Sequence, residues 1–209
     1  MSPAPRVTWQ QQHVVDVRDA AFAARTYYEQ RDLRAFLRRV TTDDRLGSAC
    51  EVGSGFGRLT IVLTEFADRV FGFEREPHFV QEASVLLPDV RFTQVATLAS
   101  LPVASASMDL ALTFTVLQHL TDTVAAAAAG EIVRLVKPGG HVLICEETDP
   151  AHRDGAVDDP HGMCTIGRTV AEYQRLFGAL DFLDTAPRRI EPTYPRPDVG
   201  TYMLFRKPA

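Results

Sequence analysis

The pattern of apolar and polar positions changes along the chain, and strand-like and helix-like segments alternate after residue 45. Short apolar runs predict strands at residues 48–52, 70–74, 90–95, 109–114 and 141–145. Between these runs, apolar residues recur at helical spacing, and an alanine-rich segment at 122–136 predicts a helix that ends at Lys137-Pro138-Gly139-Gly140. Such alternation is typical of a parallel sheet covered by helices, so we predict an α/β fold.

The two ends of the chain carry different patterns. Apolar residues at helical spacing between residues 33 and 40 predict one or two helices within the first forty residues. Residues 169–172 form a capping-box pattern, which predicts the start of another helix. Near the carboxyl end, residues 188–191 and 201–206 are short strand-like runs joined by a proline-rich link, so we expect them to pair antiparallel.

We therefore predict a single domain over residues 1–209, a Rossmann-like doubly wound sheet that is mostly parallel with an antiparallel closing strand. Residues 1–45 would form an amino-terminal helical cap and residues 46–147 a cofactor-binding core. Residues 148–209 would supply a substrate-side loop, a helix and the closing strands. A chain of this length is able to bury a substantial core.

Composition narrows the function classes. The formal net charge of −5 argues against a nucleic-acid binder held by phosphate contacts, which would normally carry a basic face. No apolar run reaches membrane-spanning length, and the first twelve residues lack the apolar segment of a signal peptide. Cys50 and Cys145 lie in apolar runs, where we expect buried reduced thiols. We expect a cytoplasmic protein that binds neither nucleic acid nor membrane, and we leave a homodimer open.

The most informative stretch is Glu51-Val52-Gly53-Ser54-Gly55-Phe56-Gly57, which has three alternate glycines between a predicted strand and a predicted helix. Glycine reaches backbone angles closed to other residues and lets a ligand approach the bare backbone. The turn also directs free N–H groups toward whatever binds there. The dinucleotide fingerprint G-x-G-x-x-G would have its third glycine where this chain has Arg58, so the spacing argues against a nicotinamide dinucleotide.

Glu74 is the second element of the predicted site. It ends the predicted second strand, seventeen residues past Gly57. Ligands of doubly wound sheets lie outside the carboxyl ends of the strands, where a carboxylate is able to accept hydrogen bonds from both ribose hydroxyls of an adenosine. The alternative is that Glu74 caps the following helix or pairs with Arg75.

With these motifs in this order, the chain resembles the class I S-adenosylmethionine-dependent methyltransferases, in particular the small-molecule enzymes, over roughly residues 49–177. Besides the glycine turn and Glu74, the resemblance rests on Leu101-Pro102, Met108-Asp109-Leu110, Val116-Leu117-Gln118-His119-Leu120 and Leu135-Val136-Lys137-Pro138-Gly139-Gly140. Each motif alone has little specificity, but their order and spacing together are specific.

The resemblance implies S-adenosyl-L-methionine as the cofactor. Glu51 would lie below the turn near the ammonium group, the glycine backbone would contact the methionine part, and Glu74 would bind the ribose. The cofactor-binding residues that the resemblance implies are Glu51, Gly53, Ser54, Gly55, Gly57, Glu74, Arg75, Thr97, Leu98 and Thr115. The chain departs from the family at Thr97, where an acidic residue often contacts the adenine amine; a hydroxyl and the backbone of Leu98 would have to serve instead.

The implied reaction is methyl transfer to an O, N or C atom of a small-molecule metabolite. The sulfonium methyl group is already activated, so an in-line displacement needs alignment, dryness and a correctly protonated nucleophile, but no metal. His119, five residues past the predicted fourth strand, is the candidate general base. The equally weighted alternative is that His119 only fixes the loop by hydrogen bonding to backbone.

Two further segments bear on the site. Tyr27, Tyr28 and Arg31 lie in the amino-terminal segment, which in this family commonly folds over the cofactor as a lid, although the tyrosines would equally serve as packing residues. Residues 146–164 hold six carboxylates and two histidines, yet their Pro, Gly and Asp content favours a solvated loop over a metal site. We therefore predict no metal, while one of those histidines could reach the substrate.

Absent motifs favour a small-molecule acceptor. No Asp/Asn-Pro-Pro-Tyr/Phe motif and no cysteine follows the predicted fourth strand, where Thr113-Phe114-Thr115-Val116 stands instead. Two alternatives remain open. One is a non-catalytic protein that binds S-adenosylmethionine or S-adenosylhomocysteine; the other, which Arg58 disfavours, is an NAD(P)-dependent oxidoreductase.

Overall fold

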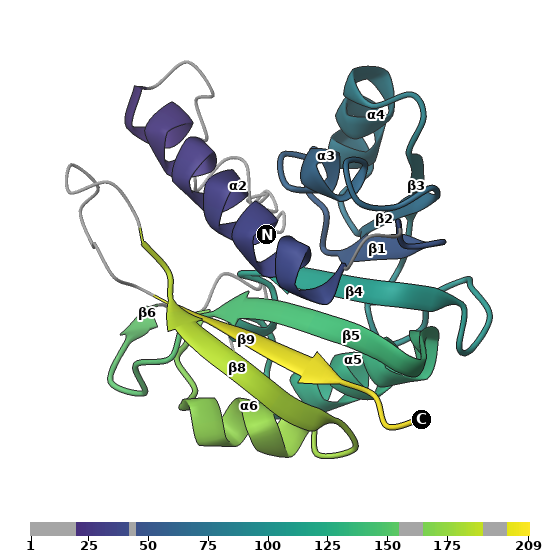
Figure 1. Ribbon diagram of the computed structural model, residues 1–209. Coiled ribbons are helices and arrows are strands. Elements are labelled where there is room, and N and C mark those ends of the chain that lie inside the picture. Colours follow the sequence, from purple (N-terminus) through teal and green to yellow (C-terminus); the bar gives the residue numbers. More distant parts are fainter. Residues whose placement is uncertain (1–19, 42–44, 155–164, 190–199) are drawn as a thin grey trace, which may run out of the picture.

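The structure is a computed structural model that describes residues 20–41, 45–154, 165–189 and 200–209 (Figure 1). The described helices are α2 (Ala20–Val40), α3 (Thr60–Leu63), α4 (Pro77–Leu86), the 3-10 helix η1 (Leu117–His119), α5 (Asp122–Leu135) and α6 (Val170–Leu176). The predicted amino-terminal helix is present as α2, while the rest of the first forty residues lies outside the described ranges. None of the described helices combines the length and the apolar composition that crossing a membrane requires.

Seven of the described strands form the main sheet, in the order β3-β2-β1-β4-β5-β9-β8. Their bounds are β1 (Ala49–Val52), β2 (Val70–Glu74), β3 (Arg91–Gln94), β4 (Met108–Phe114), β5 (Val136–Glu146), β8 (Asp181–Pro187) and β9 (Thr201–Arg206). β9 runs opposite to the other six strands of this sheet, because it pairs antiparallel with both β5 and β8. The predicted doubly wound, mostly parallel sheet with an antiparallel closing strand is confirmed. The short strands β6 (Arg153–Asp154) and β7 (Thr165–Ile166) pair separately.

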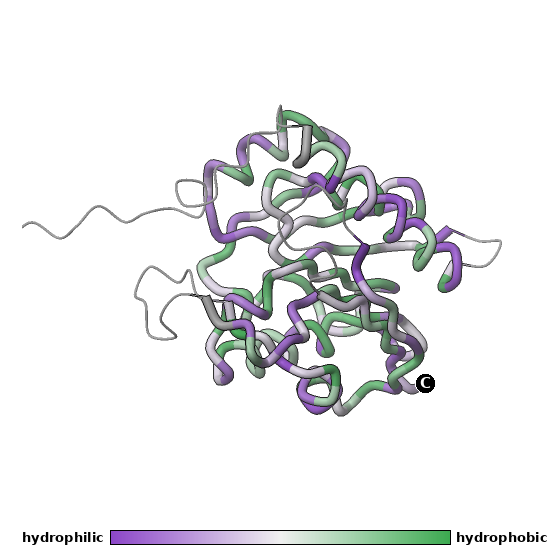
Figure 2. The backbone as a smooth tube through the Cα atoms, turned by 90° about the vertical axis from the view of Figure 1, so that its left-hand side faces the viewer, coloured by the Kyte–Doolittle hydropathy of each residue, from purple (hydrophilic) through white to green (hydrophobic). Residues whose placement is uncertain are grey.

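Helices cover both faces of the sheet (Figure 1). One face packs against α2 and the α3 segment through Leu33, Phe36, Leu37, Leu59, Val62 and Leu63. The other packs against α5 and α6 through Ala128, Ala129, Ile132, Leu135, Tyr173 and Phe177. Strands buried on both faces need continuous apolar runs, and Figure 2 shows hydrophobic segments along the interior strands. This explains why the central strands could be predicted from short apolar runs.

Two predicted details were wrong. The closing strand β8 ends at Pro187, before the predicted run at 188–191, part of which lies outside the described residues. Lys137–Gly140 does not separate helix from strand but belongs to β5, where Met108 pairs with Val136 and Leu110 with His141. The extra residues bulge out of the ladder, and Gly139 takes a φ of +77° there. Pairing on both sides of β5 holds the strand together despite its proline and glycines.

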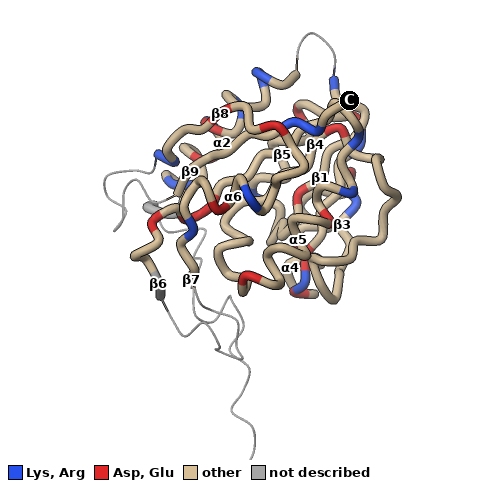
Figure 3. The backbone as a smooth tube through the Cα atoms, turned by 90° about the horizontal axis from the view of Figure 1, so that it is seen from below, with Lys and Arg blue, Asp and Glu red and all other residues tan. Residues whose placement is uncertain are grey.

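The parallel strands bring several chain segments to one edge of the sheet. β1 pairs in parallel with β2 and β4, and β4 pairs in parallel with β5, so their carboxyl ends lie together. One edge of the sheet therefore holds the glycine turn, Glu74, the loop after β4 and the segment after β5. Doubly wound folds bind their ligands at this edge. Charged positions of both signs are interspersed over the backbone in Figure 3.

The capping box of α6 yields a prediction about stability. Thr169 Oγ1 accepts a hydrogen bond from Glu172 N at 3.3 Å, and Glu172 Oε2 accepts one from Thr169 N at 2.7 Å, as the sequence predicts. Thr169→Ala should lower the free energy of unfolding by about 1 kcal/mol in a urea titration. The control Ser84→Ala removes an exposed hydroxyl that bonds Val80 O within α4, and should change stability by less than ~0.5 kcal/mol. Equal effects would contradict the capping role.

Candidate cofactor and active site

The glycine turn after β1 requires glycine at each of its three alternate positions. Gly53, Gly55 and Gly57 have φ angles of +78°, +52° and +86°, a region that other residues rarely adopt. A Cβ atom on Gly53 would lie 2.4 Å from Val116 Cγ2, so this position also lacks space. A Cβ atom on Gly55 would meet no atom within 4 Å. Gly55 therefore presents bare backbone to open space, as a ligand cradle requires.

Glu74 ends β2 and is bound to the turn. Its Oε2 accepts a hydrogen bond from Gly55 N at 2.8 Å, and its Oε1 accepts from Arg75 N at 2.7 Å and Glu76 N at 3.0 Å. Glu76 is the N-cap residue of α4, so the carboxylate also orders the start of that helix. The exposed Arg75 meets Glu74 through its backbone N–H. Glu74 thus caps the start of α4, which is the alternative to ribose binding considered above, and ribose binding stays a prediction.

Glu51 lies below the turn with its carboxylate buried. Its side chain accepts a hydrogen bond from Thr60 Oγ1 at the start of α3. The pKa of Glu51 is raised to about 8, mainly by burial and also by the charge of Glu74, while Thr60 and Arg58 act to lower it. A cation placed beside this carboxyl group would favour its ionised form. The chemistry suits an ammonium group bound above the turn.

Two side chains near this edge keep unused hydrogen-bonding capacity within the described part of the chain, one of them buried and the other exposed. The buried Ser54 Oγ has no hydrogen-bond partner within the described part of the chain. Thr97 and Leu98 follow β3 on the same edge; Thr97 is exposed and Leu98 is buried. Thr97 Oγ1 accepts a hydrogen bond from Ala99 N at 3.2 Å, which leaves its O–H as a donor.

The loop after β4 is held by Glu146, a role that sequence reasoning missed. Its buried carboxylate accepts hydrogen bonds from the N–H groups of Val116, Leu117 and Gln118 at 3.1–3.2 Å. Burial raises the pKa of Glu146 to about 7, although these hydrogen bonds lower it. Thr115, directly before these residues, has a φ of +52°. This angle is unfavourable for a β-branched residue, so contacts with the surrounding structure must stabilise the conformation.

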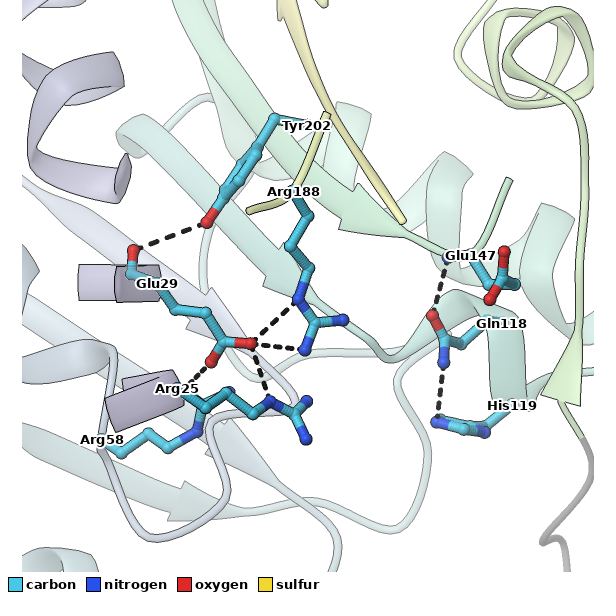
Figure 4. Close-up of polar contacts among 8 residues, drawn as sticks. All are labelled: Arg25, Glu29, Arg58, Gln118, His119, Glu147, Arg188 and Tyr202. Atoms are coloured by element: carbon cyan, nitrogen blue, oxygen red, sulfur yellow. Dashed lines mark hydrogen bonds and ion pairs between the residues drawn. The ribbon is translucent and has the colours of Figure 1, made fainter. Parts of the chain in front are cut away.

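His119 ends η1 and is half-buried beside a polar chain of residues (Figure 4). Gln118 Nε2 lies 3.3 Å from His119 Nε2, and since an amide nitrogen donates, the ring nitrogen accepts. Gln118 Oε1 in turn accepts from Glu147 N at 2.8 Å. His119 thus has a defined orientation at the ligand edge. His152 pairs with the Glu147 carboxylate after β5, while His161 lies outside the described residues.

These motifs agree with comparisons to known proteins. The family described as "Methyltransferase domain" matches residues 50–144, which include the glycine turn, Glu74 and His119. A protein from Mycolicibacterium smegmatis, described as a probable S-adenosylmethionine-dependent methyltransferase, is 30% identical over 115 residues. Residues 50–144 thus match a methyltransferase domain, and the chain is similar to S-adenosylmethionine-dependent methyltransferases. The matched region covers 52% of this chain and 44% of the relative, so the chain spans less than half of that protein's length.

Solved structures with different printed activities share the fold. The N-methyltransferase NodS from Bradyrhizobium japonicum WM9, in complex with S-adenosyl-L-homocysteine, has a TM-score of 0.67 at 19% identity over 87% of this chain and 88% of its own. The [4+2]-cyclase SpnF also has a TM-score of 0.67 at 19% identity, over 85% of this chain and 81% of its own. At these identities the likeness shows a shared fold only. Proteins with this fold catalyse more than one type of reaction.

The cap helix α2 contributes a side chain that sequence reasoning missed. Glu29 is fully buried and forms ion pairs with Arg25, Arg58 and Arg188. Its position four residues before Leu33, on the apolar face of α2, was the available signal. Tyr27, considered above as a lid residue, is 63% exposed. Across the described residues, no group of three or more metal-ligating side chains occurs, and residues 155–164 lie outside that search.

The buried carboxyl of Glu51 yields a pH-dependent prediction. Its pKa is about 8 in the folded protein against an ordinary value of 4.5, so the folded state retains a proton that the unfolded state loses between these pH values. This group therefore removes stability as pH rises through that window. Glu51→Gln should melt like the wild type near about pH 5 and several degrees higher near about pH 8.5. The exposed Glu82→Gln serves as the control, and a difference independent of pH would contradict the assignment.

Proposed function

We propose that this chain transfers a methyl group from S-adenosyl-L-methionine to an O, N or C atom of a small-molecule metabolite. The observation that carries the proposal is the glycine turn, because bare backbone at Gly55 faces open space while Glu74, at the end of β2, accepts a hydrogen bond from Gly55 N. The match of residues 50–144 to a methyltransferase domain supports this proposal. The acidic net charge of −5 and the absent Asp/Asn-Pro-Pro-Tyr/Phe motif favour a small molecule over nucleic acid as the acceptor.

The residues at the sheet edge fit such a cofactor. The backbone of Gly53–Gly57 would contact its methionine part, and the buried carboxylate of Glu51 would compensate the ammonium group. Glu74 would accept hydrogen bonds from the ribose, and the Thr97–Leu98 segment would meet the adenine. When bound, the cofactor supplies a methyl group activated by its sulfonium charge.

The chain itself would position the acceptor and remove its proton. Glu146 fixes the three N–H groups of the loop after β4, which gives His119 a defined place at the ligand edge. His119 would take the proton of a hydroxyl or ammonium acceptor as a general base. In the structure its Nε2 accepts a hydrogen bond from Gln118, so the acceptor would have to displace the Gln118 amide before this nitrogen could take the proton.

A second candidate is a protein that binds the cofactor without transferring its methyl group. The exposed Thr97, in place of the acidic residue common in the family, favours this alternative because it changes the adenine contacts. The two candidates are separated by incubating the protein with radiolabelled S-adenosylmethionine and a panel of hydroxyl, amine and carbon acceptors. Labelled product supports transfer; tight binding of S-adenosylhomocysteine without product supports the second candidate.

Cofactor binding is tested first at Gly55. Gly55→Leu places a side chain in the open space of the turn at a φ of +52°, so it should abolish S-adenosylhomocysteine binding in isothermal titration while costing about 1–2 kcal/mol of stability. The matched control is Gly130→Leu, which adds a side chain in open space on α5 and should bind normally. Wild-type stabilisation by NAD but not by S-adenosylhomocysteine in a melting assay would refute the cofactor assignment.

The role of His119 is tested with an acceptor from the panel. His119→Ala should reduce kcat by about 10²–10⁴-fold with little change in cofactor affinity, because general-base catalysis contributes roughly that factor. His119→Gln keeps a hydrogen-bonding group beside Gln118 but cannot take a proton at neutral pH, so it should be equally slow. Recovery of the rate in His119→Gln, or an unchanged pH profile in either variant, would show that His119 only fixes the loop.

A further inference from the structure

The Glu29 carboxylate joins three separate segments of the chain (Figure 4). Glu29 is fully buried in α2. Its Oε1 accepts from Arg25 Nε and Arg188 Nε, each at 2.9 Å, and its Oε2 accepts from Arg58 Nη1. Arg58 directly follows the glycine turn, and Arg188 directly follows β8. One carboxylate therefore links the cap helix, the glycine turn and the closing strands.

The cap helix holds Arg58 at two points. Besides the ion pair of its side chain with Glu29, the Arg58 carbonyl accepts a hydrogen bond from Gln30 Nε2 at 2.7 Å. At the other side of the turn, Glu74 holds the N–H of Gly55 at 2.8 Å. The flexible glycines thus lie between two fixed points, one supplied by β2 and the other by α2.

Aromatic rings fix the same cluster against the sheet. The Arg58 and Arg188 guanidinium carbons lie 5.4 Å and 5.0 Å from the ring centroid of Phe114, the last residue of β4. Phe36 of α2 stacks on Tyr202 of β9 with a centroid distance of 5.1 Å. Tyr202 Oη also lies 3.5 Å from the Glu29 carbonyl oxygen. The cap helix is consequently docked onto β4 and β9 beside the turn.

The electrostatics make this cluster act as a unit. Burial by itself would raise the pKa of Glu29, but Arg58, Arg188 and Arg25 lower it to about 2. The carboxylate is therefore ionised throughout the physiological pH range. Removing one partner of a buried ion pair leaves an uncompensated charge, so the loss of Glu29 should release Arg58 and with it the turn.

We propose that Glu29 is a positioning residue for the cofactor, which holds the glycine turn in its binding conformation through Arg58. The inference rests on the proposed function, since the ligand is S-adenosylmethionine. Ordering backbone costs free energy, and a turn ordered before binding does not incur that cost when the ligand arrives. Loss of the Glu29 carboxylate should therefore weaken cofactor binding without removing any atom that contacts the cofactor.

The experiment compares two glutamates that each pair with an arginine. Glu29→Gln breaks the cluster, whereas Glu65→Gln breaks the exposed Arg34–Glu65 pair, which also joins α2 to the α3 segment but does not involve Arg58. S-adenosylhomocysteine binding is measured by isothermal titration below the melting temperature of every variant. We expect Glu29→Gln to raise Kd about tenfold or more, with a less favourable binding entropy, and Glu65→Gln to bind like the wild type.

Two further measurements separate positioning from general destabilisation. Amide hydrogen exchange at Gly55–Arg58 in the ligand-free protein should accelerate in Glu29→Gln but not in Glu65→Gln. The increases in log Kd from Glu29→Gln and Arg58→Met should not add in the double variant, because the two residues act through one contact. If Glu29→Gln does not fold, Gln30→Ala removes only the bond to the Arg58 carbonyl and should also weaken binding.

The outcomes separate the proposed function from the proposed role of Glu29. A wild-type protein that does not bind S-adenosylhomocysteine would overturn the proposed function, and this inference with it. A wild-type protein that binds, together with unchanged affinity in Glu29→Gln and Gln30→Ala, would overturn the inference and leave the proposed function standing. Equal losses in Glu29→Gln and Glu65→Gln would likewise exclude a specific role for Glu29.

Discussion

The loops at the carboxyl edge of the sheet depend on carboxylate side chains that accept their backbone N–H groups. Where a strand ends, its N–H groups lose their ladder partners and must find other acceptors. Glu74 supplies them for the glycine turn and the start of α4, and Glu146 for the loop that carries His119. Other backbone hydrogen bonds also hold the turn, such as that from Gly53 N to Phe73 O. The carboxylates supply the acceptors that the backbone lacks, and so help to set the shape of the site.

The same residue type behaves in opposite ways at this edge because its surroundings differ. Glu29 and Glu51 are both buried, but three arginines hold the pKa of Glu29 at about 2, while burial raises the pKa of Glu51 to about 8. Glu29 therefore has its counter-ions within the protein, where it joins separate segments of the chain. Glu51 has a hydroxyl partner in Thr60, and a bound cation would complete its surroundings. This contrast separates the structural carboxylate from the one suited to a ligand.

The accuracy with which the sequence predicts a strand depends on how deeply that strand is buried. β1 and β4 are covered on both faces, so continuous apolar runs predicted them closely. β8 lies at the edge of the sheet with most of its side chains exposed, and it carried no apolar pattern to indicate a strand. In β5, Pro138 and the following glycines indicated a break, yet Gly139 and Gly140 exchange backbone hydrogen bonds with Lys207 at 2.9 Å and 2.8 Å. Neighbouring strands outweighed the local signal there.

The sequence by itself determined the order of the strands along the chain, the glycine turn, the place of Glu74 and the resemblance to methyltransferases, because each depends on residues close together in the chain. Tertiary structure decided the partners of the buried charges. Arg188 meets Glu29 across 159 positions, and Glu146 meets the loop after β4 across about thirty. A local pattern holds no information about such partners, since long-range pairing depends on where the folded sheet brings distant segments together.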